Sequence, residues 1–220
     1  MKKFKKIIIS LFIPFLSFTL TVDSDPFEST YKPLPPENIL IQDANIYDGD
    51  GNEFFETDVL IQDGKIAAIG KDLPVTNEFK IIDAAGKWVT PGIIDIHSHM
   101  GVYPAPGVRT SSDGNEATSP VTADVWAEHS IWVQDPQYAL ALKGGVTTFH
   151  ILPGSANLIG GRGVTVKNLQ RNTINSMKFP NAPHSLKMAC GENPKRVYGN
   201  RNQAPSTRMG NAAGYRKAWI

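Results

Sequence analysis

The stretch that decides the fold is residues 91–99, which read Pro-Gly-Ile-Ile-Asp-Ile-His-Ser-His. Residues 92–96 are apolar apart from Asp95, which is typical of a strand buried on both faces in a parallel sheet. His97 and His99 follow at the end of this strand. Because strand side chains alternate, both imidazoles point to one side and can bind one divalent metal, with Zn²⁺ the default. A pair of hydrogen-bonded structural histidines is the alternative.

The regions before and after residue 90 differ in their patterns. Residues 39–90 carry short apolar runs separated by turn signals such as Asp63-Gly64, which predict a small β-sandwich domain, with a partial barrel as the alternative. After residue 90, strands alternate with helices, which favours an α/β fold. The elements expected there are strands at 92–96, 146–152 and 186–190, a Gly-rich turn with a short strand at 160–167, and helices at 136–143 and from Ser206 onward.

The first 38 residues do not belong to either pattern. Residues 1–24 combine a basic start with a short apolar run, which predicts a secretory signal peptide and export to the periplasm or the exterior. An N-terminal membrane anchor is the alternative, although the run is short for a membrane span. Residues 25–38 contain four prolines and are expected to form an extended linker.

Charge and cysteine content narrow the possible partners. The chain has 22 basic and 21 acidic side chains, a formal net charge of +1, so neither nucleic acid nor a stable membrane partner is expected. A homo-oligomer stays possible. Cys190 is the only cysteine, which excludes an intrachain disulfide, and its apolar surroundings predict a buried position in a strand.

Several separated motifs resemble the amidohydrolase superfamily. Residues 90–99 resemble its first barrel strand, residues 144–148 its second strand, and residues 63–66 and 82–87 its small β-domain. More narrowly, residues 152–161 and 187–199 look like exported imidazolonepropionase-like amidohydrolases. The resemblance covers roughly residues 38–220. It implies that residues 91–220 are the N-terminal part of a (β/α)₈ TIM-like barrel, which is incomplete because a full barrel takes about 250 residues.

The same resemblance implies a metal-dependent hydrolase of carbon–nitrogen bonds. Its substrate would be a small amide, cyclic amide or peptide, attacked by water that one or two divalent ions, Zn²⁺ by default, activate. A third ligand is expected from the middle strands. Glu192, at the end of the third expected strand, is favoured, and a carbamylated Lys187 is the alternative. Two later histidines and a general-base aspartate are expected beyond Ile220.

Other residues are candidates for substrate contact, each with a structural role as the alternative. Ser155 and Asn157 follow the second expected strand, while Lys195, Arg196 and Tyr198 could bind a substrate carboxylate. His150 either lines the barrel or is a core histidine. If the later ligands are missing, the chain is instead a non-catalytic amidohydrolase fragment, or a binding or scaffold protein that uses its β-domain.

Overall fold

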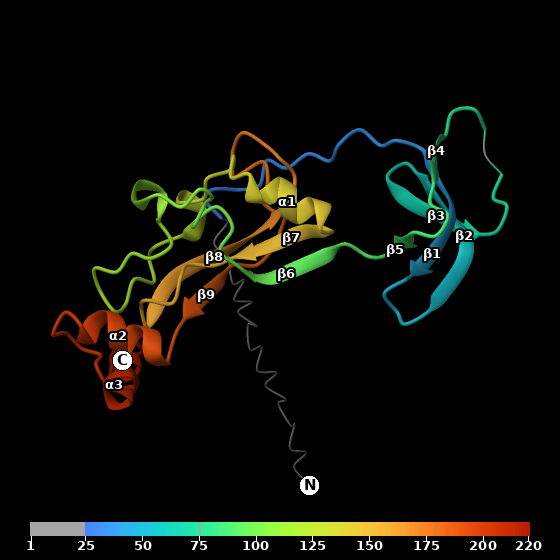
Figure 1. The fold of residues 1–220 in the computed structure, drawn as a ribbon. Coiled ribbons are helices and arrows are strands. Elements are labelled where there is room, and N and C mark those ends of the chain that lie inside the picture. The colour runs from blue at the N-terminus through green and yellow to red at the C-terminus, as the bar shows by residue number, and fades with distance from the viewer. Residues whose placement is uncertain (1–24, 75) are drawn as a thin grey trace, which may run out of the picture.

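The computed structural model describes residues 25–74 and 76–220, and Figure 1 shows two sheets joined by extended segments. The predicted signal peptide at residues 1–24 lies outside the described residues. Within the described ranges, none of the helices is long and apolar enough to cross a bilayer.

The first sheet has five strands, in the order β3-β2-β1-β4 with β5 also paired to β1. Asp63 and Gly64, both with positive φ, form the tight turn between β2 and β3, as predicted. Ala44, Ile46, Val59 and Ala84 make the core of this region. The strands are β1 (Ile39–Tyr47), β2 (Glu53–Gln62), β3 (Lys65–Gly70), β4 (Lys80–Asp83) and β5 (Trp88–Val89).

The predicted β-sandwich is not confirmed for this region, because its described strands belong to one hydrogen-bonded sheet. Strand β1 pairs antiparallel with β2 on one side and parallel with β4 and β5 on the other. Because these strands bond laterally through β1, they form one layer and not two facing sheets. A register shift at residues 41–44, where Asp43 has positive φ, interrupts the ladder between β1 and β2.

The second sheet contains β6 (Ile93–Ser98), β7 (Val146–Ile151), β8 (Ile159–Lys167) and β9 (Ser185–Met188), in that order. Strands β6 and β7 are parallel, as the sequence predicts. Helix α1 (Gln137–Lys143) lies between them in the chain and packs on β7. The Asp135 carboxylate accepts a hydrogen bond from the Gln137 amide at the start of α1, and the helix ends at Gly144.

The last two strands differ from the expected parallel pattern. Strand β8 runs antiparallel to β7, and β9 antiparallel to β8. Only residues 152–158 separate β7 from β8, a connection too short for the helical crossover that a parallel neighbour needs. The expected Gly-rich turn at 160–167 is absent, because those residues form part of the nine-residue strand β8. The described chain therefore contains an open mixed sheet and no closed barrel.

The two faces of the second sheet carry different side chains. Phe149 and Ile151 of β7 and Val164 and Val166 of β8 belong to the main hydrophobic core. Their alternating neighbours, which include His150 and Thr165, point to the opposite face. Strand β6 is not buried on both faces as predicted, since Ile96 is 76% exposed.

The C-terminal part is helical, with α2 (Glu192–Gly199) and α3 (Arg208–Ala218) beside the end of β9 (Figure 1). Helix α3 begins at Arg208, after the N-cap Thr207, and not at Ser206. Cys190 is exposed and lies beyond β9, so its prediction as a buried strand residue is wrong. Two short 3₁₀ turns, η1 (Arg109–Ser111) and η2 (Ala127–His129), lie in the long connection from β6 to α1.

Residues 25–32, at the start of the described chain, contact the segment around Lys178, between β8 and β9. The buried ammonium of Lys178 donates to the Asp25 carboxylate and the Phe27 carbonyl, and it pairs with Glu128 at 3.0 Å. The Ser29 hydroxyl donates to the Lys178 carbonyl. This part of the expected linker is thus bonded to Lys178, a residue about 150 positions later in the chain.

Candidate metal centre

The two candidate histidines lie together at the end of β6. The ring centres of His97 and His99 are 5.5 Å apart, with their planes at 79°. Two imidazoles that bind one tetrahedral Zn²⁺ through nitrogens at about 2.0–2.1 Å have ring centres roughly 5 Å apart. The spacing of the rings therefore fits one shared divalent ion.

The hydrogen bond of His99 selects its tautomer. Its Nδ1 lies 2.8 Å from the carbonyl oxygen of Leu152, which can only accept, so Nδ1 carries the proton. The lone pair of neutral His99 is then on Nε2. A backbone carbonyl behind one ring nitrogen is the usual way in which proteins orient a metal-binding histidine.

Lys187 approaches the pair from the far edge of the second sheet. It lies on β9, is 9% exposed, and places its Nζ 3.0 Å from Nε2 of His97. The positive charge of Lys187 is the main cause that lowers the pKa of His97, followed by burial and by His99. Burial also lowers the pKa of Lys187 itself. Both shifts favour neutral forms, which are the forms that bind metal or react with carbon dioxide.

Glu192, the favoured third ligand in the sequence, is placed differently. It is the first residue of α2, not the end of a strand, and its side chain is 74% exposed. Its carboxylate pairs with Arg196 at 3.1 Å, one helical turn further on. The structure therefore brings Lys187, and not Glu192, to His97.

A row of polar side chains extends from this site across the sheet. His150 on β7 hydrogen-bonds through Nδ1 to the Thr165 hydroxyl at 2.9 Å and through Nε2 to the Ser185 hydroxyl at 2.7 Å. Burial, and secondarily the charge of His97, lowers the pKa of His150. Thr165 and Ser185 were not sequence candidates. The signal that could have identified Ser185 is its position two residues before Lys187, on the same face of β9.

Two of the residues expected to contact substrate are buried in the structure. Tyr198 donates its hydroxyl proton towards Asn157 and the Ser119 carbonyl, and both side chains are at most 1% exposed. The Asn157 amide donates to the Glu116 carbonyl and the Thr122 hydroxyl. These bonds join α2 to the 116–122 loop and give both residues a structural role, and their contact with substrate stays a prediction.

The other expected substrate residues lie nearer the surface. Asn193 donates to the Ser155 hydroxyl at 2.6 Å, which ties the loop after β7 to the start of α2. Arg196 is exposed and bonds to Glu192 and Asn193, while Lys195 is half-buried on the same helix. Their contact with substrate stays a prediction.

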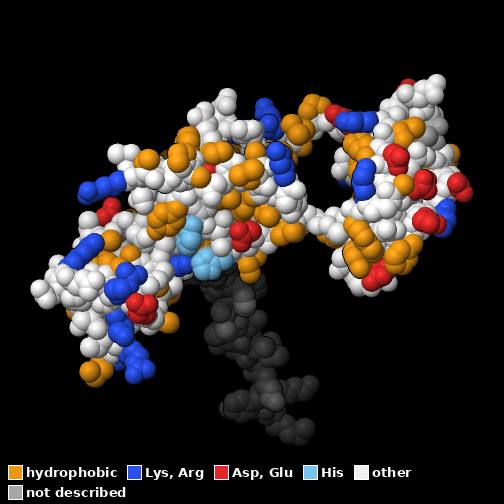
Figure 2. Space-filling view, in the orientation of Figure 1, with side chains coloured by type: hydrophobic (Ala, Val, Ile, Leu, Met, Phe, Trp, Pro, Cys, Tyr) orange, Lys and Arg blue, Asp and Glu red, His pale blue; other side chains and the backbone are white. Residues whose placement is uncertain are grey.

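The cluster is incomplete as a site of conventional ligands. In residues 25–74 and 76–220, no group of three His, Cys, Asp or Glu side chains is arranged so that it could hold a metal ion. The histidines that Figure 2 shows on the surface of the second sheet lie next to a basic side chain. The arrangement that the described residues offer is thus two imidazoles with one lysine amine.

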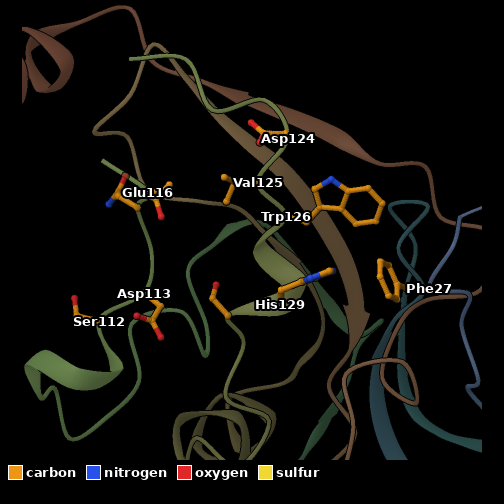
Figure 3. Close-up of a pocket in the computed structure, with 10 residues that line it drawn as sticks. Phe27, Ser112, Asp113, Glu116, Asp124, Val125, Trp126 and His129 are labelled. Carbon is orange, nitrogen blue, oxygen red and sulfur yellow. The ribbon is translucent and has the colours of Figure 1, made fainter. Parts of the chain in front are cut away.

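A pocket of about 470 Å³ lies elsewhere, over the connection from β6 to α1 (Figure 3). Phe27, Trp126 and His129 form its aromatic side, and Asp113, Glu116 and Asp124 are acidic residues around it. None of the candidate site residues lines this pocket. It is therefore separate from the histidine pair.

Comparisons with known proteins agree on one group of enzymes. No protein-family model matches the chain. Amidohydrolase tasK from Hapsidospora irregularis is 36% identical over 202 residues, which is 86% of this chain and 20% of that protein. An allantoinase from Bacillus licheniformis is 42% identical over 98 residues, 44% of this chain and 17% of the allantoinase.

A solved structure supports the same relationship. The crystal structure of an amidohydrolase from Thermotoga maritima matches with a TM-score of 0.73 and 42% identity, over 82% of this chain and 46% of that one. The chain thus spans less than half of the length of each of these three relatives.

Proposed function

Because the chain belongs to the amidohydrolase superfamily, we propose that it forms part of a metal-dependent hydrolase of carbon–nitrogen bonds. The observation that carries this proposal is the 3.0 Å contact between Lys187 and His97, with His99 beside them. Relatives named dihydropyrimidinase, allantoinase and dihydroorotase support hydrolysis of such bonds in general. The proposed substrate is a small amide, cyclic amide or peptide.

His97, His99 and Lys187 would hold the metal. His99 offers Nε2, because its Nδ1 proton is bonded to the Leu152 carbonyl. Lys187 would bind as a carbamate, for which a neutral amine is required, and burial favours that neutral form. When bound, a divalent metal supplies a Lewis acid that activates water and polarises a carbonyl group. We propose Zn²⁺, with one or two ions per site.

The position of the cluster agrees with this assignment. His97 and His99 stand at the carboxyl end of β6, on a strand parallel to its neighbour β7. Active sites of (β/α)₈ barrels lie at the carboxyl ends of the parallel strands. We propose that the second sheet is the first part of such a barrel, and that its remaining ligands and its general base come from outside residues 25–220.

Metal content and hydrolysis, measured on the same sample, test the proposal. Full-length protein, which would include the remaining ligands, should contain one or two zinc ions per chain by elemental analysis after purification with Zn²⁺ and bicarbonate. The His97→Ala variant should contain fewer. Hydrolysis is assayed on dipeptides and cyclic amides. Metal binding without hydrolysis would support the non-catalytic alternative. A folded protein that includes these remaining ligands and still binds no metal would overturn the proposal.

We also propose export of the protein, which rests on the basic start and apolar run of residues 1–24. Fractionation of the producing cell, with mass measurement of the mature N-terminus, tests it. A cytoplasmic protein that retains Met1 would contradict export, and a membrane-bound protein that retains residues 1–24 would support the anchor.

A further inference from the structure

His150 lies in the middle of the polar face, and hydroxyl groups occupy both of its ring nitrogens. Nδ1 contacts Thr165 at 2.9 Å and Nε2 contacts Ser185 at 2.7 Å. A neutral imidazole has one donor and one acceptor, and a hydroxyl can meet either. Because both ring nitrogens take part in these hydrogen bonds, His150 has no free lone pair with which to bind a metal. It instead links the Thr165 and Ser185 hydroxyl groups.

The bridge crosses an entire strand. His150 is on β7 and Ser185 is on β9, while β8 lies between them. Ser185 pairs with Gly163 of β8, where a Cβ would stand 2.6 Å from the Ser185 hydroxyl oxygen. The missing side chain at Gly163 therefore leaves the space that the Ser185 hydroxyl occupies beside His150.

Strand β9 has few backbone hydrogen bonds to hold it in the sheet. It has four residues, and among the described strands it pairs with β8 alone. A short edge strand with one neighbour is held by few backbone bonds. Ser185 and Lys187 are two positions apart, so their side chains lie on one face of β9. A contact that holds Ser185 in place therefore also holds the backbone from which the Lys187 side chain extends. Lys187 then reaches His97 at 3.0 Å.

We propose that His150 is a positioning residue that clamps β9 to β7 through Ser185 and thereby holds Lys187 at His97. This rests on the proposed function, in which Lys187 is a metal ligand. Outer groups that orient a ligand typically contribute about 10–100-fold to metal affinity. The clamp predicts an effect of that size on metal binding, transmitted by a residue that does not touch the metal.

The test measures Zn²⁺ affinity in bicarbonate buffer by competition with a chelator. His150→Phe keeps the ring and removes both bonds, and it should weaken affinity about tenfold or more. His150→Gln keeps an amide donor and acceptor and should retain more of the affinity. Ser185→Ala should weaken affinity as well, and adding it to His150→Phe should cause little further loss, since both remove the same link.

Thr165→Val is the matched control. Thr165 also bonds to His150, but it lies on β8 and does not hold β9. A merely structural role of the polar row predicts similar losses for Thr165→Val and Ser185→Ala. The clamp predicts a clearly larger loss for Ser185→Ala. Circular dichroism checks the folding of each variant, and if His150→Phe unfolds, the serine and threonine variants decide.

The outcomes separate this inference from the function on which it rests. Wild-type protein that binds no Zn²⁺ would contradict the proposed function. Hydrogen exchange at β9 would then still test the clamp, because Ser185→Ala should speed exchange there more than Thr165→Val does. Wild-type protein that binds Zn²⁺ through Lys187, with unchanged affinity in Ser185→Ala and His150→Phe, would overturn the clamp alone.

Discussion

Strand β9 and helix α2 follow each other along the chain, and each carries one candidate for the third metal ligand. On β9, Lys187 is buried on the polar face and reaches His97. On α2, Glu192 stands in solvent and pairs with Arg196. A strand side chain extends across the face of its sheet, whereas the first turn of a helix can leave the sheet altogether. Proximity in sequence to a strand end is therefore a weaker guide than the face on which a residue lies.

The largest expected effect concerns His97, which would share the metal with either candidate for the third ligand. His97→Ala should weaken Zn²⁺ binding by more than about 100-fold, because loss of a direct ligand exceeds loss of a group that only orients one. Elemental analysis and chelator competition measure it. Unchanged binding would contradict the role of His97 as a ligand and, with it, the argument that Lys187 is a ligand because it contacts His97.

Lys187→Ala and Glu192→Ala compare the two regions directly. Lys187→Ala should reduce Zn²⁺ affinity by at least tenfold, because it removes the amine beside His97. Glu192→Ala should leave affinity unchanged and lose only an exposed pair with Arg196, worth about 0.3–0.5 kcal/mol of stability. The reverse order of affinities would restore Glu192 as the ligand.

Two side chains of helix α2, the buried Tyr198 and the half-buried Lys195, should differ in their effect on stability. Tyr198→Phe should destabilise the fold by about 1–3 kcal/mol, because Asn157 and the Ser119 carbonyl lose a buried partner. Lys195→Ala, on the half-buried side of the same helix, should change stability by less than about 0.5 kcal/mol. Urea unfolding at constant pH measures both. Loss of substrate binding in Tyr198→Phe at unchanged stability would speak for a contact with substrate.

The smallest effect is a pKa shift within the pair. The charge of Lys187 lowers the pKa of His97, so Lys187→Met should raise it towards the ordinary value of about 6.5. In the metal-free wild type, His97 then stays neutral to lower pH than in the variant. NMR titration of the imidazole measures both. An unchanged pKa would mean that the amine and the imidazole are apart in solution.

Much of the fold follows from local sequence signals. Asp63-Gly64 specifies the β2–β3 turn because both residues adopt positive φ, and Asp135 and Gly144 mark the ends of α1. The antiparallel course of β8 was not predicted. Its glycines predict a turn, whereas in the structure Gly163 lies in a strand where a neighbour approaches closely.

The candidate site was only partly predictable for a related reason. The spacing of His97 and His99 sets their common direction, so the pair can be found in the sequence. The choice between Lys187 and Glu192 depends on where β9 ends and α2 begins, a boundary that sequence patterns locate poorly. The sequence offers Asn157 and Tyr198 as candidates for substrate contact, and only tertiary packing shows that they bond to each other.

The anchorage of residues 25–32 at Lys178 has a consequence for the architecture. The described part of the chain starts with residues 25–32, which contact the Lys178 region; it then forms β1–β5 and continues into β6 of the second sheet. The first sheet is therefore inserted between two chain segments, residues 25–32 and β6, that both lie with the second sheet. Removal of residues 25–32 would therefore also disturb the second sheet's side of the structure, because the Lys178 ammonium would lose Asp25 and keep Glu128 as its one remaining carboxylate among the described residues.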